Sequence, residues 1–219
     1  VTAIKENGVQ FINAKGEEKF IESELVLMSV GRRANIAGLE PLNLNVDRGA
    51  VVVDDHMRTN VESVYAVGDI NGRSQLAHSA SRMAQVAVDD MFGAGKASMN
   101  YNAIPWAVYG MPEASGCGLT QDGALKNGIE VKCATVQMRS NGRFLAENGK
   151  RASGLVKVVV DAMDGRILGL HMIGPYSSEM IWGAAALIEA GMTVDEVKDV
   201  VFPHPSVSEL IKDACFALK

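Results

Sequence analysis

Residues 64–92 read VYAVGDINGRSQLAHSASRMAQVAVDDMF, a strand pattern followed by a helix pattern. The first part is an apolar run that ends in Gly68-Asp69, which is typical of a strand stopping at the edge of a sheet. The second part carries small and apolar residues at helical spacing and predicts a helix over about 79–92, stopped by Gly93. A strand followed directly by a helix indicates an α/β architecture.

Upstream of this stretch, short apolar runs separated by turn residues predict further strands. Asn7-Gly8 lies between two such runs, which is a strong signal for a hairpin, and a second turn is expected around Lys15-Gly16. The uncharged run LVLMSV at 25–30 predicts a buried strand that is covered on both faces. The first part of the chain therefore continues the α/β pattern.

The second half of the chain has a different pattern. The composition becomes small and polar over 95–100, where we expect a domain boundary. Beyond it, the sequence predicts an antiparallel sheet with helices on one face, which is an α+β arrangement. Thr193 and Glu196 have the spacing of a capping box at the start of a short helix. The expected strands lie near 131–138 and 155–161 and in a hairpin that turns at Asp164-Gly165, and the main helix lies over 180–191 and ends at Gly191.

The segment VFPHPSVSEL at 201–210 contains the strongest candidate for catalysis. His204 lies between two prolines, which exclude a helical backbone and present the imidazole from a stiff loop. Glu209 falls in the first turn of a helix expected to begin near Ser206, within reach of one ring nitrogen. A carboxylate there fixes the tautomer and leaves the other nitrogen as a general base. Alternatively, His204 is a turn residue and Glu209 is a favourable charge at a helix terminus.

Two further positions are candidates for ligand binding at the edge of the α/β sheet. Asp69 either accepts hydrogen bonds from sugar hydroxyls or caps the turn that follows it. The helix after it would present free N–H groups to an electron-rich ligand. Arg32 and Arg33 follow the run at 25–30 and either hold a phosphate or are solvated loop charges.

The composition argues against several classes of protein. The 219 residues carry a formal charge of −5 with no basic stripe, so nucleic acid is not expected as a partner. No apolar run approaches the roughly 20 residues that a membrane span needs, so we expect no membrane contact and a cytoplasmic location. Cys117, Cys133 and Cys215 are widely spaced and are expected to be reduced and mostly buried. No metal site is expected, because histidines, cysteines and carboxylates do not cluster at ligand spacing.

Seven blocks follow one another along the chain: VLMSVGRRAN, RTNVESVYAVGDI, LAH, MPEASGCGLTQDGA, GLVKVVVD, RILGLHMIGP and HPSVSEL. Together they resemble the carboxyl-terminal half of the flavin-dependent pyridine nucleotide-disulfide oxidoreductases of class I, most closely the dihydrolipoamide dehydrogenase branch. The resemblance covers essentially the entire chain and implies the fold of the FAD- and NAD-linked disulfide reductases. It divides the chain into the end of an NAD-binding domain at 1–30, the last part of an FAD-binding domain at 31–97, and a dimerisation domain at 101–219.

The resemblance also implies roles for individual positions. Asp69 would bond the flavin ribityl chain, and Ala77 would contact the isoalloxazine ring of FAD through its backbone. His204 would exchange a proton with a dithiol substrate, with Glu209 as its orienting carboxylate, and would serve the flavin and disulfide of the other subunit. The positions implied to line the nicotinamide dinucleotide site are Ser29, Val30, Gly31 and Arg32.

Two features of that family do not occur in these 219 residues. The sequence contains no GxGxxG loop, which seats a pyrophosphate on a helix terminus, and no cysteine pair with CxxxxC spacing. We therefore expect a carboxyl-terminal fragment that is inactive and colourless by itself. We also expect its apolar runs at 25–30 and 64–70 to be buried by parts of the enzyme outside this sequence.

The resemblance implies that the intact enzyme oxidises dihydrolipoamide to lipoamide through a redox disulfide and FAD, with reduction of NAD. The implied partners are a second copy of the chain, bound through 101–219, and the dihydrolipoyl domain of a 2-oxo acid dehydrogenase complex. A disulfide reductase of the glutathione reductase kind is the alternative within the same fold. A non-catalytic dimerisation module is the alternative from another class, favoured by the apolar helix at 180–191.

Overall fold

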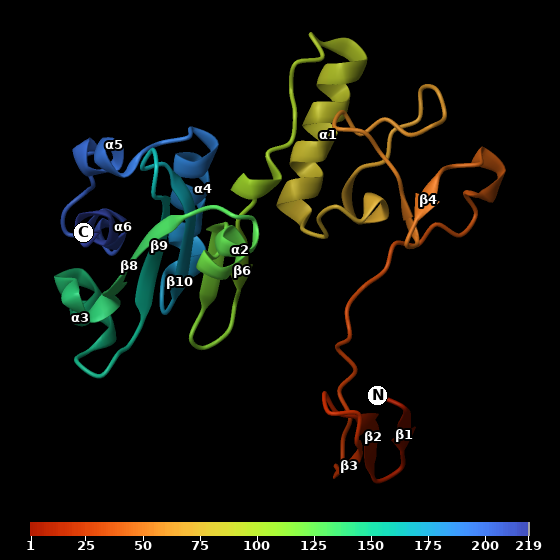
Figure 1. Cartoon of the computed structure of the whole chain (residues 1–219), viewed down its shortest axis with the longest axis horizontal. Helices are drawn as coiled ribbons and strands as arrows, with labels where there is room; N and C mark the ends of the chain where they lie inside the picture. The colour runs from red at the N-terminus through yellow and green to blue at the C-terminus, as the bar shows by residue number, and fades with distance from the viewer. Residues whose placement is uncertain (219) are drawn as a thin grey trace.

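The amino-terminal residues form a small antiparallel sheet of two hairpins (Figure 1). The computed structural model describes residues 1–218. In it, β1 (Ala3–Lys5), β2 (Gly8–Ile12) and β3 (Glu18–Glu22) pair in sequence order. Val9 of β2 lies opposite Ile4 on one side and Ile21 on the other. Both predicted hairpins are therefore confirmed.

The apolar run at 25–30 is not a strand, so the prediction of a strand there is wrong. Leu25 and Leu27 are each 91% exposed, and Val30 is 85% exposed. The run crosses from the small sheet to the rest of the molecule as a bare extended segment (Figure 1). A strand needs a neighbour to pair its backbone N–H and C=O groups, and within residues 1–218 this run has none.

The middle of the chain folds around α1 (Ala77–Phe92), and we call residues 36–92 the α1 unit. The helix is confirmed and starts two residues earlier than expected. The run at 64–67 is not a regular strand, which corrects that prediction, since only a single bridge joins Arg58 to Tyr65. The other elements are η1 (Glu40–Leu42), β4 (Val46–Asp47), β5 (Ala50–Val51) and η2 (Gly68–Asn71), and the buried core consists of Val51, Val53, Met57, Ala66, Met83 and Ala87.

An ion pair between the buried Asp90 carboxylate and the exposed Arg58 fastens the end of α1 to this bridge. The Asp90 side chain is only 3% exposed and accepts two hydrogen bonds of 2.6 Å from the Arg58 guanidinium and one of 2.7 Å from the Tyr65 hydroxyl. The Arg58 guanidinium lowers the pKa of Asp90. A buried carboxylate without such partners would be strongly destabilising, so the three side chains lock α1 in place.

The carboxyl-terminal half is a five-stranded antiparallel sheet with helices, which we call the sheet unit (residues 106–218). The strand order is β6-β7-β10-β9-β8. Alternate residues Val156, Val158 and Val160 of β9 point into one core, which buried side chains of α4, α5 and α6 complete. The elements are β6 (Trp106–Val108), β7 (Ala114–Gly118), α2 (Gln121–Lys126), β8 (Val131–Gln137), η4 (Met138–Ser140), α3 (Gly142–Asn148), β9 (Leu155–Asp161), β10 (Ile167–Ile173), α4 (Ser177–Glu189), α5 (Val194–Asp199) and α6 (Glu209–Phe216).

This unit confirms the predicted antiparallel sheet, and its helix boundaries follow from local chemistry. The capping box is present at α5, where the Thr193 hydroxyl and the Glu196 carboxylate each accept a hydrogen bond from the other residue's backbone N–H. Helix α6 begins at Glu209 rather than near Ser206, because Val207 and Ser208 form a turn before it. None of the helices within residues 1–218 combines the length and the hydropathy of a membrane span.

Candidate functional site

His204 and Glu209 form a hydrogen-bonded pair in the loop between α5 and α6. The Nδ1 atom of His204 lies 2.9 Å from Oε1 and 3.1 Å from Oε2 of Glu209. The imidazole is 81% exposed, whereas the Glu209 side chain is 25% exposed. With Nδ1 donating to the carboxylate, Nε2 is the nitrogen that can accept or release a proton. The structure thus brings together the two residues that the sequence paired.

The backbone of this loop is held by polar contacts that reach across the unit. The Ser206 N–H donates to Glu209 Oε2 at 3.0 Å, and the Ser206 hydroxyl donates to the Pro203 carbonyl at 2.6 Å. The Asn141 side chain donates to the Ser206 carbonyl at 2.9 Å and accepts from the Phe144 N–H, so that one buried amide serves the loop and caps α3. Sequence reasoning missed Asn141, because the 65 residues between it and Ser206 carry no signal of the contact.

The electrostatics of the pair favour an ionised carboxylate. The pKa of Glu209 is lowered, first by the hydrogen bond from the Ser206 N–H and then by the bond from His204. Hydrogen bonds to a charged carboxylate stabilise that form. The ionised carboxylate orients the imidazole and stabilises the imidazolium that forms when Nε2 takes up a proton. The pair can therefore act as a general base and, after protonation, as a general acid.

Asp69 lies in η2 and Ala77 is the first residue of α1, two elements of the α1 unit that pack against each other. Gly68 has φ of +79°, and a Cβ at this position would lie 3.2 Å from Cβ of Ala80, so η2 packs closely on the first turn of the helix. The Asp69 side chain is exposed, and the Leu76 side chain does not cap the helix. An exposed carboxylate beside uncapped N–H groups fits a ligand with sugar-type hydroxyls and an electron-rich ring.

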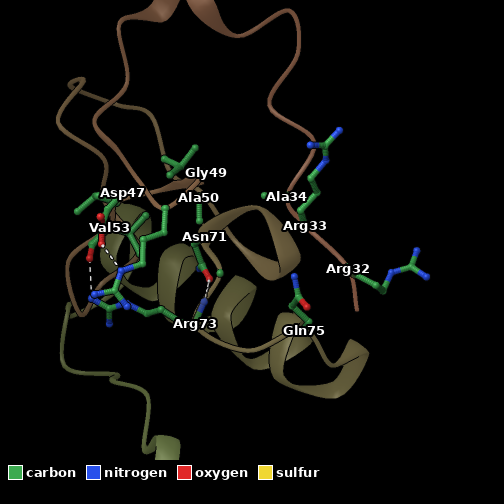
Figure 2. A pocket seen from close by; sticks show the side chains of 14 residues that line it. Arg32, Arg33, Ala34, Asp47, Gly49, Ala50, Val53, Asn71, Arg73 and Gln75 are labelled. Atoms are coloured by element: carbon green, nitrogen blue, oxygen red, sulfur yellow. Dashed lines mark hydrogen bonds and ion pairs between the residues drawn. The ribbon is translucent and has the colours of Figure 1, made fainter. Parts of the chain in front are cut away.

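Ser29, Val30, Gly31 and Arg32 lie on the exposed extended segment and form no defined site by themselves. Arg32 and Arg33 border a cavity of about 550 Å³ whose other wall includes Arg73. Figure 2 shows that the Arg32 and Arg33 side chains point away from Arg73. The three guanidinium groups therefore do not converge on one anion, and the arrangement is that of solvated loop charges.

The two candidate regions are far apart within one chain. His204 lies in the loop between α5 and α6, whereas Asp69 and Ala77 lie at the base of α1, and Figure 1 shows the body of the sheet unit between them. A single chain in this arrangement does not place the imidazole against a group bound at Asp69.

The three cysteines are free thiols, as expected. Cys117 and Cys215 are buried and Cys133 is half-buried. Burial raises the pKa of the Cys117 and Cys215 thiols to about 11. Because the thiolate is the reactive form, these two cysteines are inert structural residues at neutral pH.

Comparison with known proteins establishes the class to which this fold and site belong. The family model for the dimerisation domain of pyridine nucleotide-disulphide oxidoreductases matches residues 104–215, and the model for the pyridine nucleotide-disulphide oxidoreductase domain matches residues 1–84. The chain therefore belongs to the pyridine nucleotide-disulphide oxidoreductase family, which is a family of flavin-dependent oxidoreductases. The resemblance drawn from the sequence is confirmed.

Curated relatives of this chain are named dihydrolipoyl dehydrogenases. The chain is 38% identical to a dihydrolipoyl dehydrogenase of Geobacillus stearothermophilus, over 96% of this chain and 45% of that protein. It is 34% identical to a mitochondrial dihydrolipoyl dehydrogenase of Schizosaccharomyces pombe, over 95% and 41% of the two proteins. The chain spans about half the length of the curated relatives it matches.

Solved structures agree with this fold. LpdA of Mycobacterium tuberculosis superposes with a TM-score of 0.81 at 25% identity, over 96% of this chain and 46% of that one. The HOCl-induced flavoprotein disulfide reductase RclA of Escherichia coli superposes with a TM-score of 0.80 at 28% identity, over 98% and 49% of the two chains. The predicted fold class is thereby confirmed.

Proposed function

We propose that this chain supplies the proton-transfer and dimerisation part of a flavin-dependent dihydrolipoyl dehydrogenase. The observation that carries the proposal is the hydrogen bond of 2.9 Å between His204 and Glu209 in a chain whose relatives bear that name. A structural turn would not need an imidazole that is 81% exposed and held by a hydrogen-bond network that reaches Asn141.

In this proposal His204 moves the proton of the reaction. Nε2 accepts the proton of a dithiol substrate as the thiolate attacks a redox disulfide, and Glu209 holds Nδ1 and stabilises the imidazolium. FAD, when bound, would supply the redox chemistry that carries electrons from the reduced disulfide to NAD. Asp69 and Ala77 would hold the ribityl chain and the ring of FAD, and Ser29, Val30, Gly31 and Arg32 would line the nicotinamide site.

A homodimer reconciles the separation of the two regions. The family assignment of residues 104–215 as a dimerisation domain supports self-association. We propose that the contact lies at the groove of about 670 Å³ between α4 and residues 200–208, where Trp182 is 71% and Val201 is 90% exposed. Exposed apolar side chains of this size are typical of protein interfaces. In the dimer, His204 of one subunit serves the flavin held at Asp69 of the other.

We also propose a substrate partner and a location for the intact enzyme, and a behaviour for the isolated 219-residue chain. The dihydrolipoyl domain of a 2-oxo acid dehydrogenase complex is the proposed substrate, and the cytoplasm is the proposed location. The 219 residues contain neither a CxxxxC pair nor a GxGxxG loop, so we propose that they neither oxidise a dithiol nor carry flavin colour alone. An absorbance spectrum of the purified chain with a flavin band in the visible would contradict this last point.

The central test is His204→Gln in the flavoenzyme that contains these residues. We expect dihydrolipoamide oxidation to fall by about 10²–10⁴-fold, the usual contribution of a general base, while the flavin spectrum is unchanged. His56→Gln, at a histidine of the α1 unit, is the matched control and should retain activity. Near-normal turnover of His204→Gln would refute the role of His204.

A different disulfide substrate is the second candidate, because one of the similar structures is a flavoprotein disulfide reductase. Its reaction would use the same His204–Glu209 pair with a glutathione-type disulfide. Parallel assays with lipoamide and with glutathione disulfide separate the two candidates, and a kcat/KM that favours glutathione disulfide would select this alternative.

A further inference from the structure

The two folded units meet at η3 (Tyr101–Ala103), which leads from the α1 unit into β6. Tyr101 packs against the core of the α1 unit. On the other side, β7 and α4 pack against η3, and the Cys117 thiol lies 3.7 Å from the Asn102 carbonyl. Figure 1 shows the chain returning from the far end of α1 to η3, beside the first turn of the helix. The orientation of η3 on α1 therefore sets the orientation of the sheet unit.

Arg73 fastens one end of η3. Its guanidinium donates to the Val53 carbonyl at 2.6 Å and to the Asp55 carboxylate at 3.1 Å. The same guanidinium lies 5.5 Å from the centre of the Tyr101 ring and 3.5 Å from the Tyr101 hydroxyl. A planar guanidinium suits such simultaneous hydrogen bonding and stacking.

His78 fastens the other end of η3. It is the second residue of α1, and its Nε2 donates to the Pro105 carbonyl at 2.7 Å. Arg73 lies within the segment from Asp69 to Ala77, and His78 follows directly after it in the first turn of α1. Arg73 thus contacts the first residue of η3, and His78 contacts the chain just beyond its last residue.

We propose that Arg73 and His78 are positioning residues that clasp η3 and fix the sheet unit relative to the loop from Asp69 to Ala77. The inference rests on the proposed function for its purpose, because proton transfer from His204 in a dimer requires both regions in fixed places. Neither residue belongs to the His204–Glu209 pair. Losing the clasp leaves each core intact and frees one unit to reorient against the other.

The test measures the relative orientation of the units in the chain itself, without flavin or turnover. Residual dipolar couplings of backbone amides in a weakly aligned sample report whether two units share one alignment tensor. The unchanged chain is expected to show one shared tensor. The double variant Arg73→Met with His78→Leu is expected to give two tensors of different magnitude, while couplings within each unit still fit its own fold.

Three further variants make the test specific. Arg166→Met is the matched control, because Arg166 pairs with Asp164 in the same turn of the sheet unit; it should keep one tensor. His78→Gln keeps an N–H donor for Pro105 and should rescue the single variant His78→Leu. If the double variant loses its fold, His78→Leu alone decides the matter. One shared tensor in the clasp variants, or two tensors in Arg166→Met, would overturn the proposal.

The proposed function survives or fails independently. A shared tensor in every variant would remove the positioning role and leave the His204 assay untouched. Loss of activity in His204→Gln with no change of tensor would support the chemistry without bearing on the clasp.

Discussion

Apolar side chains are buried in the sheet unit but exposed on the segment at 24–34. In the sheet unit, Phe144, Val158 and Leu210 are fully buried in one core. In the segment, Leu25 and Leu27 are each 91% exposed although the sequence is equally apolar. Apolar sequence alone therefore does not bury a side chain; it needs other elements of the same chain or of a partner to pack against.

The same contrast separates the two groups of candidate site residues. His204 and Glu209 stand on the packed unit and are fixed to within hydrogen-bond distance. Ser29 and Arg32 stand on the exposed segment, and no packing fixes their direction. The direction of a site side chain is therefore fixed in this structure only where the residue stands on a core formed by residues 1–218. Substitutions at Phe144, Asn141, Thr193 and His204 test whether the two regions differ in this way in solution.

The largest expected effect is in the core of the sheet unit. Phe144→Ala removes a fully buried ring and should lower the free energy of unfolding by about 3–5 kcal/mol. Leu27→Ala is the matched control on the exposed segment and should change it by less than about 0.5 kcal/mol. Urea unfolding followed by circular dichroism measures both. Equal losses in the two variants would show that the segment is packed in solution, and the comparison would fail.

The next effect links stability to the site. Asn141→Ala removes the cap of α3 and the hydrogen bond to the Ser206 carbonyl, with an expected loss of about 2 kcal/mol. The His204 loop should also become mobile, seen as faster hydrogen exchange at Ser206. Asn148→Ala, which loses only a bond within α3, is the control and should leave Ser206 protected. Unchanged hydrogen exchange at Ser206 in Asn141→Ala would show that the His204 loop keeps its conformation without the hydrogen bond from Asn141.

Local signals in the sequence were enough for part of this structure. Asn7-Gly8 predicted its hairpin, and Thr193 with Glu196 predicted the capping box, because each depends on neighbours within a few residues. The His204–Glu209 contact, only five residues apart, was predicted for the same reason.

What the sequence did not reveal depends on contacts between distant segments. The run at 25–30 has the composition of a buried strand, but a strand exists only where another strand pairs with it. Asn141 reaches Ser206 across 65 residues, and His78 reaches Pro105 across 27. The spacing of apolar residues and the capping signals carry no information about such contacts. The residues that hold the site in place are therefore visible only in the folded chain.

A smaller effect is expected at the capping box. Thr193→Ala removes the hydroxyl that accepts from the Glu196 N–H, and such a loss costs about 1 kcal/mol. Thr2→Ala, at an exposed position before β1, should change the free energy of unfolding by less than about 0.5 kcal/mol. Urea unfolding again measures both. If Thr2→Ala lowers the free energy of unfolding as much as Thr193→Ala does, the hydroxyl of Thr193 contributes no specific capping energy to the sheet unit.

The smallest expected effect is a pH dependence at Glu209. Its pKa in the folded chain is lowered from the ordinary value of 4.5, so its contribution to stability is present above that value and is lost as the pH falls through the lowered pKa. A carboxyl-carbon NMR titration should therefore give a midpoint below 4.5. In His204→Gln the midpoint should stay below the ordinary value, because the largest cause of the shift is the Ser206 N–H. A return to the ordinary value would instead show that the imidazole carries the shift and that the packed loop contributes little.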